Sequence, residues 1–179
     1  MDKETEHLIA GCRRGERAAQ LKLYRRYAPR LYASCLRIVG NPPEAEEATQ
    51  DAFLKILTHM EQYRDGQCFE AWMSRIAVHT AIDYVRRQSP EMEELTDRLP
   101  EPLPDEAEEE REAEIQYTVA RVKAAIGDLP AGCRVVLSLY LFEGYDMEEI
   151  ASILGIQPAS VRSQYLRAKR KLIELLKNR

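Results

Sequence analysis

A short acidic segment divides the chain and restricts the folds that it can adopt. Residues 91–114 contain twelve acidic and two basic residues, and four prolines lie within it or just before it, at positions 90, 100, 102 and 104. Such a segment has too little apolar surface to form a core, and its prolines disfavour helix. We therefore expect two domains, residues 1–88 and 114–179, joined by an acidic linker over residues 89–113.

The charge of the whole chain hides this division. A net charge of −4 argues against a nucleic-acid partner, since such proteins are usually basic. Residues 1–90, however, carry a net charge of +2 and residues 115–179 one of +4. Because the acidity belongs to the segment between them, either end can bind nucleic acid.

On both sides of the acidic segment, apolar residues recur at the spacing of helices, and no extended alternation typical of strands occurs. Before it, the pattern predicts helices over about 21–39, 42–60 and 69–87. The acidic run itself leads into a helix that ends near residue 126, and further helices are expected over about 131–142, 146–153 and 158–177. The predicted fold class is all-α, with two small helical domains.

The last two predicted helices have the pattern of a helix-turn-helix. Gly155 lies where the turn requires a positive φ, and Pro158 starts the second helix. The face of this helix opposite its apolar side carries hydroxyl, amide and guanidinium groups, which can contact base edges and phosphates. A solvated helix in a plain bundle is the alternative. The candidate DNA-binding residues are Pro158, Ala159, Ser160, Arg162, Ser163, Gln164, Arg167, Arg170 and Lys171.

The helix over 69–87 carries a second, weaker signal for nucleic acid. Cations alternate there with aromatic residues, a combination that binds unpaired bases by stacking and phosphates by charge. On an apolar face, however, Trp72 is more often a core residue than a platform for a base. The candidate residues here are Tyr63, Arg75, His79, Thr80, Asp83, Arg86 and Arg87.

The helix over 42–60 has an outward face that suits a protein partner. Acidic and amide side chains surround an apolar one there, and such a face can dock a basic helix. An ordinary solvated face explains the same residues. The candidate partner-binding residues are Glu46, Glu47, Gln50, Asp51 and Leu54.

Other classes of function are disfavoured. The sequence has no Gly-rich phosphate loop, no HExxH motif and no plausible nucleophile with a His and an acid nearby. Its four cysteines are far apart and its three histidines form no ligand pair, so we expect reduced thiols, no metal and no cofactor. No apolar run approaches the roughly 18 residues that span a membrane, and the N-terminus is too charged for a signal peptide. We expect a cytoplasmic protein that does not insert into membranes.

Three stretches resemble a known family, the extracytoplasmic-function sigma factors of bacterial RNA polymerase. PEAEEATQDAFLKIL (43–57) is similar to the polymerase-binding helix, FEAWMSRIAVHTAIDYVRR (69–87) to the promoter-melting helix, and residues 128–172 to region 4. Three motifs in the right order are far more specific than one. With the first helices included, the resemblance extends over nearly the whole chain except the linker.

The resemblance implies a role for each part. Region 2, within residues 1–88, would bind the β′ clamp helices through Gln50, Asp51 and their neighbours, while the loop near 61–68 and the following helix open the −10 element. Region 4, within residues 114–179, would read the −35 element and contact the β flap. The resemblance further implies no covalent chemistry of its own, core RNA polymerase and promoter DNA as partners, and an anti-sigma factor as an expected partner.

Some residues depart from the family pattern. His79 replaces a frequent Asn at a position facing promoter DNA, Glu47-Ala48 replaces the common Asp-Leu, and Gln157 occupies the usual Ser or Thr helix cap. Two other functions remain open on this basis: a stand-alone helix-turn-helix regulator and a helical adaptor that does not bind DNA. The stretch over 69–87 favours the sigma factor, because an ordinary regulator needs no melting helix.

Overall fold

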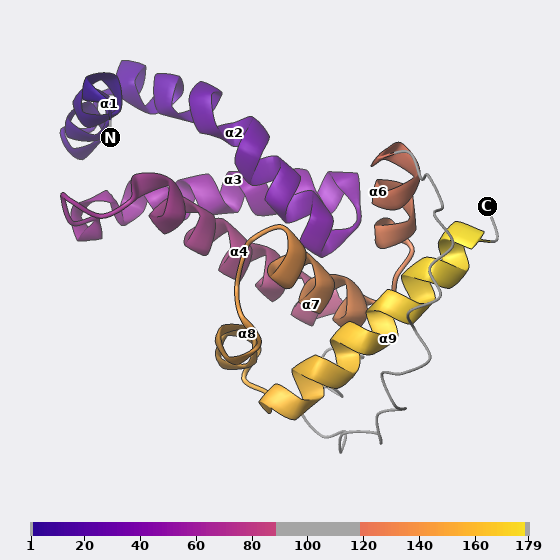
Figure 1. The fold of residues 1–179 in the computed structure, drawn as a ribbon. Helices are drawn as coiled ribbons and strands as arrows, with labels where there is room; N and C mark the ends of the chain where they lie inside the picture. The colour runs from indigo at the N-terminus through magenta and orange to yellow at the C-terminus, as the bar shows by residue number, and fades with distance from the viewer. Residues whose placement is uncertain (1, 89–118, 178–179) are drawn as a thin grey trace. The chain divides into compact units, whose positions relative to one another are not determined.

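The computed structural model describes residues 2–88 and 119–177, which contain helices and loops and no strand (Figure 1). The chain divides into two compact units, Met1–Gln88 and Ser89–Arg179. These observations confirm the all-α fold with two small helical domains. The predicted linker over residues 89–113 and the start of the helix that was expected to follow it lie outside the described residues.

The N-terminal domain is a helical bundle with a short additional turn. Its elements are α1 (Lys3–Arg13), α2 (Arg17–Val39), α3 (Pro42–Thr58), the 3-10 turn η1 (Met60–Gln62) and α4 (Phe69–Gln88). Helices α2, α3 and α4 pack against one another, and α1 packs against α2. Fully buried side chains from all three bundle helices form the core, among them Leu23, Leu31, Ile38, Ile56 and Met73.

Local signals explain the junction of α2 and α3. Gly40 ends α2 in the left-handed conformation, with φ of 79°, where glycine is favoured. The side chain of Asn41 then accepts a hydrogen bond from the backbone amide of Glu44 at 3.3 Å, and Pro42 occupies the first helical position, where its missing amide proton costs nothing.

The sequence prediction did not include helix α1. Asp2 caps it by accepting a 2.7 Å hydrogen bond from the Thr5 amide, and Leu8, Ile9 and Cys12 form its buried face. An N-cap acid followed by apolar residues at helical spacing was the signal that could have revealed it.

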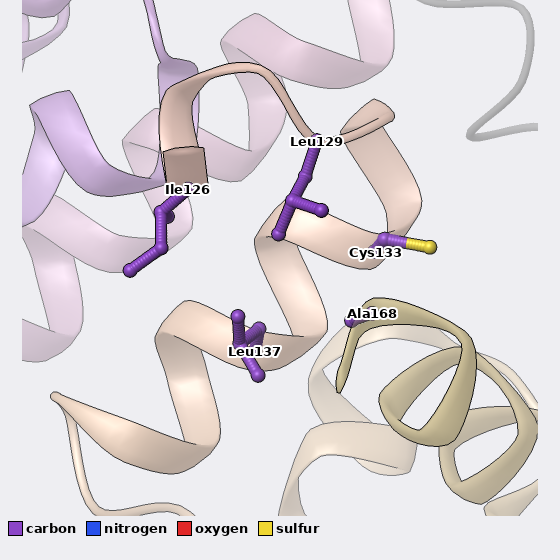
Figure 2. Close-up of a cluster of buried hydrophobic side chains, with 5 residues drawn as sticks. All are labelled: Ile126, Leu129, Cys133, Leu137 and Ala168. Carbon is purple, nitrogen blue, oxygen red and sulfur yellow. The ribbon is translucent and has the colours of Figure 1, made fainter. Parts of the chain in front are cut away.

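The C-terminal domain contains α6 (Val119–Gly127), α7 (Ala131–Leu141), α8 (Met147–Leu154) and α9 (Pro158–Lys177). Helices α6, α7 and α9 and the turn between the first two share a cluster of buried side chains, Ile126, Leu129, Cys133, Leu137 and Ala168 (Figure 2). A guanidinium nitrogen of Arg121 donates to the carbonyl of Leu176 at 3.0 Å and fastens α6 to the end of α9.

The turn between α8 and α9 has the predicted geometry. A capping box starts α8, since Asp146 and Glu149 each accept the other's backbone amide. Gly155 ends this helix with φ of 69°, and the amide of Ile156 donates to the carbonyl of Ala151 at 3.1 Å. The structure therefore confirms the helix-turn-helix and the positive φ expected of Gly155.

In the described part of the chain, no helix combines the length and the apolar character that a membrane crossing requires. The described residues also contain no group of His, Cys, Asp and Glu arranged to hold a metal ion. All four cysteines are free thiols, of which Cys68 alone is exposed.

Candidate functional site

Helix α9 is held against its domain by one face and presents cations on another. Val161 and Ala168 are fully buried, which fixes the orientation of the helix. Of the predicted DNA-binding residues, Ala159, Arg162, Arg170 and Lys171 are exposed, whereas Pro158, Ser160, Ser163 and Arg167 are half-buried. The cations therefore remain accessible along the helix.

The prediction that Gln164 lies on this exposed face is wrong. Its side chain is only 7% exposed, and its Oε1 accepts a hydrogen bond from the buried thiol of Cys133 on α7 at 3.3 Å. The neighbouring hydroxyl of Ser163 is also buried and has no hydrogen-bond partner within the described part of the chain. The amide at position 164 thus belongs to the contact between α7 and α9, because it satisfies a polar group there.

Helix α4 presents a row of charged and polar side chains. Arg75, His79, Asp83 and Arg86 are exposed at spacings of three or four residues, so they share one face, and Arg87 lies beside them. Desolvation of the ring lowers the pKa of His79, and the cations Arg75 and Arg86 lower it further against the opposing effect of Asp83. His79 is therefore neutral at pH 7 and offers a hydrogen-bonding group rather than a charge.

Two predicted members of this surface are buried. Thr80 is 1% exposed, and its hydroxyl donates to the carbonyl of Ile76 at 2.8 Å while it accepts from Nζ of Lys55 at 3.1 Å. Tyr63 is 2% exposed, and its hydroxyl donates to the carbonyl of Gln67 at 2.7 Å. Their polar groups are satisfied within the domain, which corrects their assignment to an exposed surface.

The aromatic residues around the start of α4 pack on one another. The ring of Phe69 lies 4.9 Å from that of Tyr63 and is stacked 5.7 Å from that of Trp72. Phe69 is buried and Trp72 is half-buried. This packing supports the interpretation of Trp72 as a residue at the edge of the core.

The outward face of α3 is exposed as expected. Glu46, Glu47, Gln50 and Leu54 are exposed and Asp51 is half-buried. Leu54 stands out because its apolar side chain is 63% exposed. Contact between apolar surface and water is unfavourable, so burial of this side chain by a partner would be stabilising.

An aromatic residue of α2 extends this exposed apolar surface. The ring of Tyr24 is 40% exposed and lies 4.7 Å from the ring of Phe53, the neighbour of Leu54 in the chain. Helical spacing cannot distinguish a residue at the border of the apolar face from one in its middle.

Direct contacts join the candidate faces of α3 and α4. The hydroxyl of Tyr84 on α4 donates to the carboxylate of Asp51 on α3 at 2.7 Å, and Arg87, also on α4, lies over the Tyr84 ring at 4.3 Å. Nζ of Lys55 is 3.9 Å from the carboxylate of Asp83. Between the two helices lies a pocket of about 530 Å³, lined by Asp51, Lys55, Thr80, Asp83, Arg86 and Arg87.

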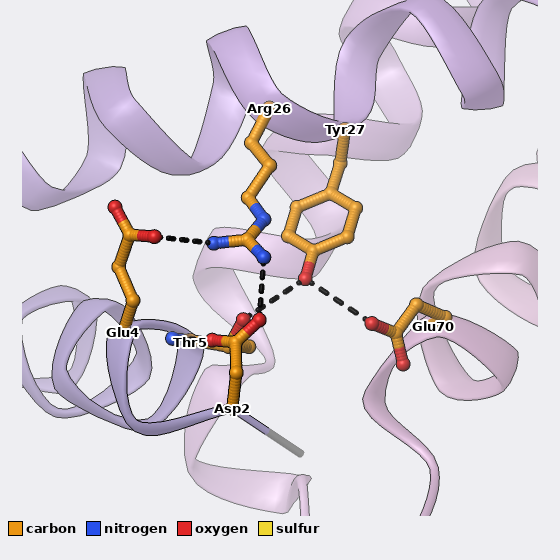
Figure 3. Close-up of polar contacts among 6 residues, drawn as sticks. All are labelled: Asp2, Glu4, Thr5, Arg26, Tyr27 and Glu70. Carbon is orange, nitrogen blue, oxygen red and sulfur yellow. Dashed lines mark hydrogen bonds and ion pairs between the residues drawn. The ribbon is translucent and has the colours of Figure 1, made fainter.

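At the other end of the N-terminal domain, α1 is tied to α2 by ion pairs. Arg26 donates to the carboxylates of Asp2 at 2.6 Å and Glu4 at 3.1 Å (Figure 3). Hydrogen bonds from the backbone amide and the side chain of Thr5, and then the hydrogen bond and charge of the Arg26 guanidinium, hold the pKa of Asp2 below its ordinary value. Arg26 is 24 residues from Asp2 and 22 from Glu4 in the sequence, so local sequence does not reveal the contact.

A small helical domain with an exposed, cation-bearing helix-turn-helix defines this chain as a member of the class of helix-turn-helix DNA-binding proteins. The N-terminal domain of the same chain carries a second charged surface, the exposed face of α4. Comparison with known families identifies the family within this class. Residues 23–91 match the model of sigma-70 region 2 and residues 120–172 that of sigma-70, region 4. The chain therefore belongs to the sigma-70 family.

Relatives agree with this assignment. The chain is 32% identical to the ECF RNA polymerase sigma factor SigE of Mycolicibacterium smegmatis, over 87% of this chain and 60% of that protein. It is 28% identical to the RNA polymerase sigma-H factor of Pseudomonas aeruginosa, over 93% of this chain and 91% of the relative. These matches confirm the resemblance to extracytoplasmic-function sigma factors. They support RNA polymerase binding and promoter-specific initiation of transcription.

Solved structures share the fold. The sigma factor RpoE from Bartonella quintana, in complex with the anti-sigma factor NepR, matches with a TM-score of 0.56 at 22% identity, over 87% of this chain and 95% of that one. CnrH, in complex with the cytosolic domain of CnrY, matches with a TM-score of 0.53 at 23% identity, over 98% and 99% of the two chains.

Proposed function

We propose that this protein binds core RNA polymerase and directs it to promoters by reading a −35 element with α9 and opening a −10 element with α4. The observation that carries the proposal is the presence of both sigma-70 regions, in order, on one chain. A stand-alone regulator needs only the second region. Sigma factors are initiation factors rather than catalysts, so the polymerase supplies the chemistry.

The −35 element would be read in the major groove by the first turns of α9. Ala159, Ser160 and Arg162 follow the start of the helix at Pro158, and this is the part of a recognition helix that contacts base edges. Arg167, Arg170 and Lys171 lie further along, where cations suit phosphates and fix the register on the duplex.

The −10 element would be opened by α4 and the preceding loop. Arg75, Arg86 and Arg87 supply positive charge along one helix face, and neutral His79 supplies a hydrogen-bonding group among them. Extracting a base from the stack costs a few kcal/mol, which contacts to phosphates and to the extruded base must offset.

The outward face of α3 would bind the β′ clamp helices, with region 4 on the β flap. An exposed leucine within a ring of acidic and amide side chains matches a basic, amphipathic helical partner in both charge and polarity. Leu54 is the apolar centre of that face.

An anti-sigma factor is the other partner that we propose, with action in the cytoplasm. RpoE and CnrH, which share this fold, were each solved with a protein partner, and NepR is named as an anti-sigma factor. The same exposed surfaces of this chain would be covered by such a partner when the polymerase is not bound.

Transcription in a reconstituted system tests the proposal. Purified protein is added to bacterial core polymerase with a pool of genomic fragments, and the 5′ ends of the transcripts are sequenced. We expect new start sites that share two spaced elements upstream. Failure of the protein to bind core polymerase would overturn the proposal, and duplex binding alone would favour a stand-alone regulator.

A matched pair of variants tests the docking face. Leu54→Ala is expected to weaken core binding about tenfold, since it removes a side chain that becomes buried in the complex. Leu21→Ala removes a leucine of α2 that is also half exposed and is expected to change binding less than twofold. Both should retain the unfolding midpoint of the wild type. Equal effects of the two on core binding would count against α3 as the docking face.

A further inference from the structure

The loop between η1 and α4 is exposed but anchored at both ends. Residues 64–68 are all exposed, whereas Tyr63 before them and Phe69 after them are buried. The rings of these two anchors lie 4.9 Å apart, which closes the base of the loop. Gly66 has φ of 95°, a conformation that favours glycine.

Arg13, at the end of α1, binds the first part of this loop. Its Nη2 donates to the carbonyl of Tyr63 at 2.7 Å and lies 3.2 Å from the carboxylate of Asp65. The guanidinium carbon is 5.9 Å from the centre of the Tyr63 ring. A planar guanidinium can engage a carbonyl, a carboxylate and an aromatic face at once, which the single ammonium of a lysine cannot.

The partners of this contact differ in exposure. The Arg13 side chain is 27% exposed and that of Asp65 is 75% exposed. The Arg13–Asp65 ion pair alone therefore contributes little, whereas the short hydrogen bond from a charged group to a backbone carbonyl is of the stronger kind.

Helices α1 and α2 also hold the far end of the loop. The hydroxyl of Tyr27 donates to Glu70 in the first turn of α4 at 3.3 Å, and the hydroxyl of Thr5 lies 3.3 Å from that of Tyr27 (Figure 3). The thiol of Cys68 lies 3.6 Å from the other Glu70 oxygen. A backbone hydrogen bond, with those from Cys68 and Tyr27, keeps the pKa of Glu70 below its ordinary value, so the acceptor stays ionised at neutral pH.

We propose that Arg13 is a positioning residue for promoter opening: from α1, it holds the 64–68 loop in the conformation that meets the −10 element. This inference rests on the proposed function. A loop that is already ordered loses less conformational freedom when DNA binds, and it presents Arg64 and Gln67 in one arrangement. The specificity for the −10 element then depends on a helix that does not itself contact DNA.

Three substitutions separate positioning from stability. Arg13→Ala removes every contact that Arg13 makes with the loop. Arg13→Lys keeps the charge but replaces the planar guanidinium by a single ammonium, and Asp65→Asn removes only the ion pair. Arg14→Ala is the matched control, because it removes a neighbouring cation whose partner is Glu16 of the α1–α2 connection. Each variant is assembled with core polymerase and assayed on promoters from the transcription experiment that carry single-base changes across the −10 element.

We expect Arg13→Ala to lower transcription from the best promoter about tenfold and to reduce the ratio between preferred and altered −10 bases. Core binding and −35 duplex binding should stay within twofold of the wild type. Arg13→Lys should recover part of the base preference. Asp65→Asn, which removes only the exposed ion pair, should change transcription less than twofold, and Arg14→Ala should match the wild type.

Two results would overturn the inference. One is a wild-type base preference in Arg13→Ala. The other is an equal loss on every template that is accompanied by weaker core binding, which indicates general destabilisation. If Arg13→Ala does not fold, Arg13→Lys decides, because it keeps the charge but cannot engage the carbonyl, the carboxylate and the ring at once, and a wild-type base preference there would count against positioning. Failure of the wild type to initiate would instead refute the proposed function.

Discussion

Each domain pairs its proposed DNA-facing helix with a neighbouring helix, but the two contacts differ. Between α3 and α4, Tyr84 donates to Asp51 at 2.7 Å, and within α4 Arg87 packs on the Tyr84 ring. Between α8 and α9, Arg162 lies 3.7 Å from Glu148, and both side chains are more than half exposed. The first contact is short and partly buried, whereas the second is long and solvated.

This difference bears on how the two domains work. Asp51 belongs to the face proposed to bind polymerase, and its partner Tyr84 lies on the helix proposed to open DNA, so docking can influence promoter opening through one hydrogen bond. The contact between Glu148 and Arg162 is of a kind that contributes little to stability. We therefore expect coupling between partner and DNA in the N-terminal domain and independent DNA reading in the C-terminal domain.

The largest effect is expected from Asp51→Ala. It leaves the Tyr84 hydroxyl without its acceptor, so the free energy of unfolding of the N-terminal domain should fall by about 1–2 kcal/mol, with weaker binding to core polymerase. Urea unfolding and a core-binding titration measure the two effects. Asp51→Asn, which keeps an oxygen acceptor, should recover most of the stability, and equal losses in both variants would show that the hydrogen bond is not the cause.

A smaller effect is expected from Tyr84→Phe, about 1 kcal/mol, and it should depend on pH. The hydrogen bond to Asp51 and then burial raise the pKa of Tyr84 above 10. Because the folded-state pKa is the higher one, this stabilisation is complete below about pH 10 and is lost as the pH rises through the raised pKa. Urea unfolding at pH 8 and pH 11 should show the gap between wild type and variant shrinking, and a constant gap would contradict this.

The smallest effect is expected from Glu148→Ala. Loss of an exposed ion pair should change the free energy of unfolding by less than about 0.5 kcal/mol, and −35 duplex affinity should not decrease, because Arg162 stays available to DNA. Chemical unfolding and a duplex-binding titration of the full chain measure both. A loss as large as that of Asp51→Ala would remove the contrast between the domains.

Local signals made part of this architecture predictable. The start of α3 follows from Asn41 and Pro42, and the turn before α9 follows from Gly155, since caps and turns depend on adjacent residues. The exposed face of α3 followed from helical spacing, and motif order identified the family.

Contacts between distant residues were not predictable. Thr80 and Gln164 lie at polar positions of their helices but are buried, because Lys55 and Cys133 reach them from other helices. Tyr63 is buried by Phe69, and Arg13 reaches it from a helix that the sequence prediction did not include. Helical spacing predicts which residues share one face of a helix. Whether a residue of that face is buried depends on which other helices pack against it.

Permanganate reactivity of promoter thymines tests the central claim most directly, because the reagent oxidises unpaired thymines. With the protein and core polymerase together, we predict reactive thymines around the −10 element of a responsive promoter and none with either component alone. A promoter that is bound and protected at the −35 element but remains fully paired at −10 would contradict the account and identify a duplex-binding regulator instead.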